Sequence, residues 1–320
     1  MSIYIILYFT YFFNPILKFF ALENITMKCK PIFKGVCTAL VTPFKNGEVD
    51  YPSLKGLIEF QIESGIDALL INGTTGESAT LNEDEKQELI SFAVREVDGR
   101  VPLIAGTGSN STRSAIQLSK FAHAVGANAL LVVTPYYNKA SADGLYKHYE
   151  AIADACDAPI FIYNVPSRTG LNIPLEIYER LAKIDNIVAI KEASTSVSDL
   201  VRLAQRCGGT LDVYSGNDDL ILPALALGGK GVISVLSNAL PKETCDICKL
   251  WFAGNVEGAR TLQLRLLPLI NALFSEVNPI PVKALLSHLG FCDEEYRLPL
   301  CQMGENNKKT LFEIYEEFKF

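Results

Sequence analysis

The chain has 320 residues, of which 49% are hydrophobic, and this suits one large domain with an appendage better than two equal domains. Its net charge of -7 and pI near 5.2, without a long run of Lys or Arg, argue against nucleic acid as a partner. Eight cysteines are scattered along the chain with no sign of secretion, so we expect reduced thiols and a cytoplasmic protein.

Residues 1–30 form an apolar leader unlike the rest of the chain. Lys18 is the only charge between Met1 and Leu22, and neither a basic segment nor a small-residue cleavage site marks a secretory signal. We expect translation to start at Met27, which leaves the leader outside the native protein. A membrane or interfacial segment and a structured extension are the alternatives, and no membrane association of the remainder is expected.

Short apolar runs then alternate with longer amphipathic stretches. The starts of these runs are 20 to 33 residues apart, the length of one strand, one helix and two loops. Their near-continuous apolarity indicates strands buried on both faces. The predicted strands are Val36 to Val41, Ala68 to Asn72, Val101 to Ala105, Ala129 to Thr134, Pro159 to Asn164, Ile187 to Lys191, Leu211 to Tyr214 and Gly231 to Val235.

Eight such units predict an α/β fold of the (β/α)8, or TIM barrel, type over residues 31–254. An open doubly wound sheet is the alternative, but the first strand lacks a glycine-rich dinucleotide turn. Asn82, Ser111 or Thr112, and Ser196 are candidate helix N-caps. Residues 255–320 are expected to form a small helical domain, with helices Asn255 to Ile270, Pro281 to Leu289 and Thr310 to Phe320.

Lys191 is the first candidate catalytic residue, since barrel enzymes place active groups at the carboxyl ends of strands. It ends a strand with no other polar residue, and an ammonium group drawn into a barrel loses hydration, which favours the neutral amine. A neutral amine is a nucleophile for carbonyls. The alternative is a lysine that reaches out to solvent or pairs with Glu192.

Three further strand ends carry polar groups. The glycines and hydroxyls of Gly73-Thr74-Thr75-Gly76 can hold a carboxylate, or merely form a turn. Tyr163 can move a proton, although buried tyrosines more often only satisfy a hydrogen bond. Arg168 can bind a carboxylate at a pocket mouth, although most loop arginines are solvated. Thr134 to Asn138 form the remaining polar end.

These motifs resemble those of the dihydrodipicolinate synthase branch of the pyruvate-dependent class I aldolases. The resemblance rests on Gly73-Thr74-Thr75-Gly76-Glu77-Ser78, on Tyr163-Asn164-Val165-Pro166-Ser167-Arg168-Thr169-Gly170 and on the Lys191 strand, and it runs from about Phe33 to the C-terminus. It implies a lyase of lysine and diaminopimelate biosynthesis that condenses pyruvate with aspartate semialdehyde. It implies no metal or organic cofactor.

The resemblance also assigns catalytic roles. Lys191 would form the imine with pyruvate, and the protonated imine would make the methyl group acidic enough to give an enamine. Thr74, Tyr163 and Tyr137 would relay protons, with Tyr137 reaching into the site of the neighbouring subunit. A homodimer within a tetramer, as a dimer of dimers, is therefore expected.

The implied binding residues complete this site. Thr75 and nearby backbone would hold the pyruvate carboxylate, and the Gly216 turn and Ile233 would complete the pocket. Arg168 would bind the carboxylate of aspartate semialdehyde.

Regulation by lysine is where the chain departs from the family pattern. Members inhibited by lysine usually carry an acidic residue at the position of Ser114, and often histidines where Glu83 and Lys86 stand. Asn110 and Tyr136 match the inhibitor pocket. Because the ligand's ammonium group would lose a charge partner, we expect weak or absent inhibition.

Two other functions fit parts of the pattern. A sibling lyase acting on N-acetylneuraminate or a 2-keto-3-deoxy sugar acid would share the pyruvate machinery, but sialic-acid lyases typically have Ser-Thr in place of Thr74-Thr75 and lack Arg168. A barrel that binds a keto acid without catalysis is the alternative from another functional class.

Cys245 and Cys248 form a single C-x-x-C in an expected helix, and we assign them no metal or redox role.

Overall fold

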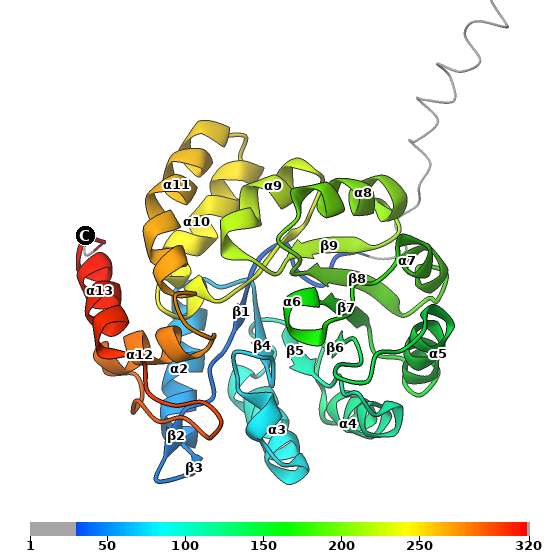
Figure 1. Ribbon diagram of the computed structural model, residues 1–320, viewed down its shortest axis with the longest axis horizontal. Helices are drawn as coiled ribbons and strands as arrows, with labels where there is room; N and C mark the ends of the chain where they lie inside the picture. The colour runs from blue at the N-terminus through cyan, green and yellow to red at the C-terminus, as the bar shows by residue number, and fades with distance from the viewer. Residues whose placement is uncertain (1–29, 319–320) are drawn as a thin grey trace, which may run out of the picture.

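The computed structural model describes residues 30–318, and the leader expected over residues 1–30 lies outside them apart from Lys30. Eight parallel strands close into a barrel in the order β1-β10-β9-β8-β7-β6-β5-β4 (Figure 1). The predicted barrel is confirmed, and the open sheet is excluded. The strands are β1 Gly35–Ala39, β4 Ala68–Ile71, β5 Leu103–Gly106, β6 Ala129–Val133, β7 Ile160–Asn164, β8 Ile187–Glu192, β9 Asp212–Ser215 and β10 Gly231–Ser234.

Helices surround the barrel and bury one face each against it (Figure 1). Asn82, Ser111 and Ser196 cap α3, α4 and α8 with their side chains, so Thr112 is the first residue of its helix and not the cap. The helices of the barrel are α2 Tyr51–Glu63, α3 Glu83–Val97, α4 Thr112–Val125, α5 Ala142–Ala153, α6 Pro166–Thr169, α7 Leu175–Leu181, α8 Val197–Cys207, α9 Ile221–Ala226 and α10 Pro241–Phe252.

Alternation along the strands divides the core into two layers. Every second side chain points into the barrel, and the others pack against the helices. At the centre, the rings of Phe33, Phe161 and Tyr214 lie together, with centroids of Phe33 and Tyr214 4.3 Å apart. Tyr214 also donates a 2.6 Å hydrogen bond to the carbonyl of Phe33. The interior is therefore filled and does not form a pore.

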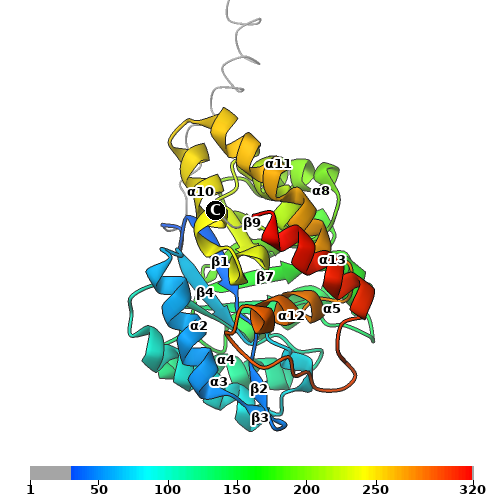
Figure 2. The ribbon, with the colours of Figure 1, turned by 90° about the vertical axis from the view of Figure 1, so that its left-hand side faces the viewer.

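The last three helices, α11 Val256–Ala272, α12 Ile280–His288 and α13 Glu305–Glu316, gather with α10 on one side of the barrel (Figures 1 and 2). Each was predicted, although α13 begins five residues earlier than Thr310. A hairpin of β2 Phe44–Lys45 and β3 Glu48–Val49 was not predicted, because two-residue strands carry no periodicity to detect. Short 3-10 turns η2 Ser78–Thr80, η3 Asp218–Leu220 and η4 Leu236–Asn238 follow three barrel strands.

Within residues 30–318, no helix has the length and apolarity to cross a membrane. The seven cysteines in this part of the chain are unpaired. Cys245 and Cys248 are both buried in α10, and the Cys245 thiol donates to the Gly65 carbonyl at 3.6 Å.

Candidate functional site

Lys191 lies inside the barrel. It is the fifth residue of β8, between the inward-facing Ala189 and Ala193, and only 6% of its surface is exposed. In the strand register it stands beside Tyr163 of β7, and its Nζ is 4.5 Å from the centroid of the Tyr163 ring. The alternative of a lysine reaching out to solvent is thereby excluded.

Glu192, the next residue, points the other way. Its carboxylate accepts hydrogen bonds from Asn164 (3.0 and 3.1 Å), Tyr178 (3.2 Å) and the amide of Ser194 (2.8 Å). Burial raises the pKa of Glu192, and the bonds from Ser194 and Asn164 oppose that shift. Glu192 therefore joins the end of β8 to β7 and α7, and its four bonds leave no role for it as a partner of Lys191.

The loop after β4 places Thr74 and Thr75. The Gly76 amide donates to the Gly73 carbonyl at 3.1 Å, and the Glu77 amide donates to the Thr74 carbonyl at 3.0 Å, so the loop is a pair of tight turns. Thr75 is 3% exposed, and its Oγ1 accepts a 3.1 Å hydrogen bond from Asn278 Nδ2. Because that oxygen is an acceptor here, the hydroxyl proton of Thr75 is free to be donated to an anion.

Gly216 packs against the end of the strand that carries Lys191, and Ile233 lies in the interior of the barrel. A Cβ on Gly216 would lie 2.6 Å from the Cβ of Ala193, so the close approach of this turn to the end of β8 requires glycine. The Gly216 amide donates to the Glu192 carbonyl at 2.6 Å. Ile233 is fully buried and belongs to the same interior cluster as Tyr163.

A cavity of about 800 Å³ opens at the carboxyl ends of the strands. Thr74, Tyr163, Arg168 and Tyr137 line it. Lys191, Thr75, Gly216 and Ile233 are not among its lining residues, but Lys191 contacts Tyr163 and Thr75 contacts Asn278, and both of these residues line it. Four of the eight predicted residues therefore line the cavity, and Lys191 and Thr75 lie directly behind residues that do.

Tyr137 and Arg168 lie toward the solvent side of this cavity. Tyr137 has a left-handed backbone (φ 70°), and 92% of its surface is exposed. Arg168 belongs to the short helix α6, is exposed, and donates from Nη2 to the Asn278 carbonyl at 3.2 Å. Neither side chain lies in the interior beside Lys191 in this single chain.

Sequence reasoning missed Asn278. It joins Thr75 to Arg168 through its side chain and its carbonyl, and its buried Oδ1 has no hydrogen-bond partner within residues 30–318. An unpaired acceptor in a cavity wall can bind a donor of a ligand. Asn278 lies in the loop between α11 and α12, where no sequence pattern marks it as part of a site.

Sequence reasoning also gave Glu77 no role. Its side chain is fully buried and forms an ion pair with Lys283 of α12, whose side chain is equally buried. The signal was present in the sequence: Lys283 is the only charged residue in the apolar run Ile280 to Leu286, and a buried charge needs a partner.

A closed (β/α)8 barrel with a cavity at the carboxyl ends of its strands is the arrangement of a TIM-barrel enzyme. The Dihydrodipicolinate synthetase family matches residues 32–317. The chain belongs to this family.

Individual relatives agree with that assignment. The 4-hydroxy-tetrahydrodipicolinate synthase of Clostridium perfringens (strain SM101 / Type A) is 51% identical over 282 residues, which are 88% of this chain and 97% of that protein. The enzyme of the same name from Geobacter sulfurreducens is 51% identical over 288 residues, 90% and 99% of the two chains. The crystal structure of dihydrodipicolinate synthase from Thermotoga maritima superposes with a TM-score of 0.88 at 46% identity, covering 90% of this chain and 99% of that one.

Proposed function

We propose that this chain is a 4-hydroxy-tetrahydrodipicolinate synthase, a lyase of lysine and diaminopimelate biosynthesis that joins pyruvate to aspartate semialdehyde on Lys191. The observation that carries the proposal is the position of Lys191, which is buried on the inner face of β8 and in contact with Tyr163, a residue that lines the cavity. The names of the relatives support the same reaction.

The first half of the reaction forms an enamine. The Lys191 amine attacks the ketone carbon of pyruvate, and water leaves to give an imine. The protonated imine then draws electrons from the methyl group, which loses a proton. Tyr163 and Thr74 carry these protons, because both residues line the cavity and each has a hydroxyl group. The imine is itself the electron sink, so the scheme requires no metal or organic cofactor.

The pyruvate carboxylate is held at the loop after β4. The free hydroxyl proton of Thr75 and nearby backbone amides donate to it, and the Gly216 turn and Ile233 close the pocket around the methyl group. A carboxylate in this position keeps the ketone carbon within reach of Lys191.

The second half uses the aldehyde. Arg168 binds the carboxylate of aspartate semialdehyde at the cavity mouth. The enamine carbon attacks the aldehyde carbon, whose oxygen takes up a proton and becomes a hydroxyl. The amino group of the semialdehyde then attacks the imine carbon and displaces Lys191, which closes the ring and releases the product.

Tyr137 serves the site of a neighbouring subunit. Its 92% exposure leaves the side chain accessible to a second copy of the chain. We therefore propose a dimer as the catalytic unit, paired into a tetramer in the cytoplasm, with residues 31–254 as the catalytic domain and 255–320 as the helical domain.

An assay with two substrate sets tests the proposal. The protein should turn over pyruvate with aspartate semialdehyde and should not cleave N-acetylneuraminate. The opposite result would make it a sibling lyase. Pyruvate binding without turnover of either substrate would make it a keto-acid-binding barrel.

A further inference from the structure

The loop that carries Thr74 and Thr75 is attached to the C-terminal helices by a buried ion pair. Lys283 of α12 and Glu77 have no exposed side-chain surface, and Lys283 Nζ donates a second bond, of 3.0 Å, to the Glu295 carbonyl. The ammonium group also lies 4.3 Å from the centroid of the Phe44 ring. The ammonium group of Lys283 is therefore surrounded by protein atoms and has no contact with solvent.

Glu77 ends the loop with a backbone conformation that residues other than glycine rarely adopt. Its φ is 54°, in the left-handed region, which is costly for a residue other than glycine and persists only where its surroundings fix it. The contacts that fix it come from the C-terminal segment: Lys283, and the amide of Arg297, which donates to Glu77 Oε2 at 3.4 Å.

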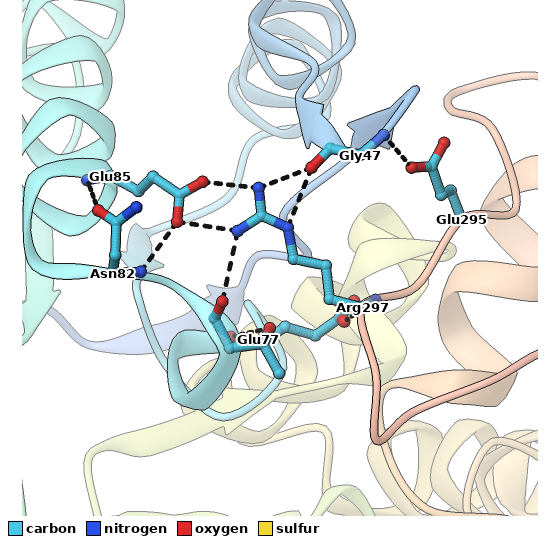
Figure 3. A network of polar contacts seen from close by, with 7 residues as sticks. Gly47, Glu77, Asn82, Glu85, Glu295 and Arg297 are labelled. Carbon is cyan, nitrogen blue, oxygen red and sulfur yellow. Dashed lines mark hydrogen bonds and ion pairs between the residues drawn. The ribbon is translucent and has the colours of Figure 1, made fainter.

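Arg297 holds the chain just beyond the loop (Figure 3). Its guanidinium group donates two bonds to Glu85, of 2.6 and 2.8 Å, and others to the carbonyls of Thr80 (3.3 Å) and Gly47 (2.8 Å). Together with the Asn278 bond to Thr75, these contacts fasten residues 75–85 to residues 278–297 at successive points.

Stability alone does not account for this arrangement. A buried ion pair is often no more stabilising than apolar side chains of similar size, because both charges must be desolvated. What charged hydrogen bonds add is a fixed direction and distance. Here these bonds fix the position of a loop that carries two hydroxyl groups of the proposed site. A displacement of about 1 Å in such groups can lower the rate about 100-fold.

We propose that Lys283 and Arg297 are positioning residues that act through Glu77 and Glu85 to hold the Gly73–Glu77 loop in the form that binds the pyruvate carboxylate. The inference rests on the proposed function, which places that carboxylate at Thr75. It assigns the C-terminal helices a part in substrate affinity.

The test compares two substitutions at the ion pair. Lys283→Met leaves Glu77 buried without its charged partner, whereas Lys283→Met with Glu77→Gln removes both charges. We expect both to raise the pyruvate KM at least about fivefold, with a change below about twofold in the KM for aspartate semialdehyde. The melting temperature should fall in the single variant and recover in the double variant, while the pyruvate KM should stay high in both.

Arg297→Lys is a milder test, because it keeps the charge but loses the two-pronged bond to Glu85. It should also raise the pyruvate KM. Arg100→Lys is the matched control, since Arg100 forms an equivalent two-pronged bond to Glu59 (2.7 and 2.6 Å) on the outer surface. Lys308→Met, which breaks a pair with Glu294 without touching the loop, controls for loosening of the C-terminal segment.

A double variant with wild-type stability and a wild-type pyruvate KM would overturn the inference. Two results in combination would also overturn it: neither Lys283 variant folds, and Arg297→Lys leaves the pyruvate KM unchanged. The contacts would then serve stability only. Borohydride trapping of pyruvate separates failure of the positioning role from failure of the proposed function. If the variants are trapped at the same half-saturating pyruvate concentration as the unmodified protein, only the positioning role is refuted. If the unmodified protein is not trapped at all, both are refuted.

Discussion

Two lysines are buried in the described part of the chain, and their surroundings differ. Lys283 forms an ion pair with Glu77, whereas Lys191 makes no ion pair within residues 30–318 and contacts the face of Tyr163. Burial lowers the pKa of Lys283, and the charge of Glu77 opposes the shift. Lys283 is thus committed to a carboxylate, and the nitrogen of Lys191 is left to react with a substrate.

Arg168 tests the assignment of the second substrate. Arg168→Ala removes a charged hydrogen-bond donor worth about 1.5–3 kcal/mol, so the KM for aspartate semialdehyde should rise by about 10- to 150-fold. The KM for pyruvate should change less than about twofold. Steady-state kinetics with each substrate varied in turn measure both constants, and an equal rise in the two would place Arg168 elsewhere in the reaction.

Ser114 leads to a prediction about regulation. Ser114, Glu83 and Lys86 line the outer part of the cavity, and Lys86 already pairs with Glu83 at 2.9 Å. A bound lysine would find no carboxylate at Ser114 for its ammonium group. Activity should therefore persist in millimolar lysine, and Ser114→Glu should increase the inhibition. Strong inhibition of the unmodified protein below millimolar lysine would contradict this.

At the scale of elements, the contact between α4 and α5 contains a buried histidine. His148 Nδ1 lies 2.9 Å from Thr112 Oγ1, and its Nε2 is buried without a partner within residues 30–318. Burial lowers the pKa of His148 to about 4, from an ordinary value of 6.5.

Acid should therefore destabilise this contact. Between pH 6.5 and about 4 the unfolded chain binds a proton at His148 that the folded chain does not, so stability falls as pH falls through this range, by up to roughly 3 kcal/mol. His148→Gln should flatten this part of the curve of unfolding free energy against pH. His123→Gln, at an exposed position of α4, should leave it unchanged. Parallel curves for His148→Gln and the unmodified protein would refute the prediction.

The barrel strands were predictable because each is a short run buried on both faces. Burial on both faces makes nearly every residue of the run apolar, and that pattern is visible in the sequence alone. Lys191 and Tyr163 were predictable because parallel strands bring their carboxyl ends to one place. The bond between Thr75 and Asn278 and the pair of Glu77 with Lys283 join residues about 200 positions apart. The lone charge of Lys283 in an apolar run indicates that it needs a partner, but a local pattern does not identify which distant residue that partner is. The division into a catalytic domain of residues 31–254 and a helical domain of residues 255–320 stays a prediction.

For the whole molecule, the central question is whether one chain contains a complete site. Tyr137 is 92% exposed, so we expect its hydroxyl to act in a partner's site. Lys191→Ala and Tyr137→Phe should each be nearly inactive alone. When the two are unfolded, mixed and refolded, hybrid dimers contain one site with both residues intact, and about a quarter of the activity should return.

No recovery in the mixture, with hybrids verified by mass, would mean that Tyr137 serves its own chain or none. Refolded samples of each variant alone are the control, because they contain the same defects without an intact combination.

The most direct measurement of the account is borohydride reduction in the presence of pyruvate, followed by peptide mapping. We predict a stable addition of pyruvic acid less one oxygen atom, located on Lys191 and absent without pyruvate. Lys191→Ala should abolish it. Lys230→Ala should not, because Lys230 precedes the amino end of β10, whereas Lys191 lies near the carboxyl end of β8. Failure to label, or a label on another lysine such as Lys283, would contradict the assignment of Lys191 as the imine-forming residue.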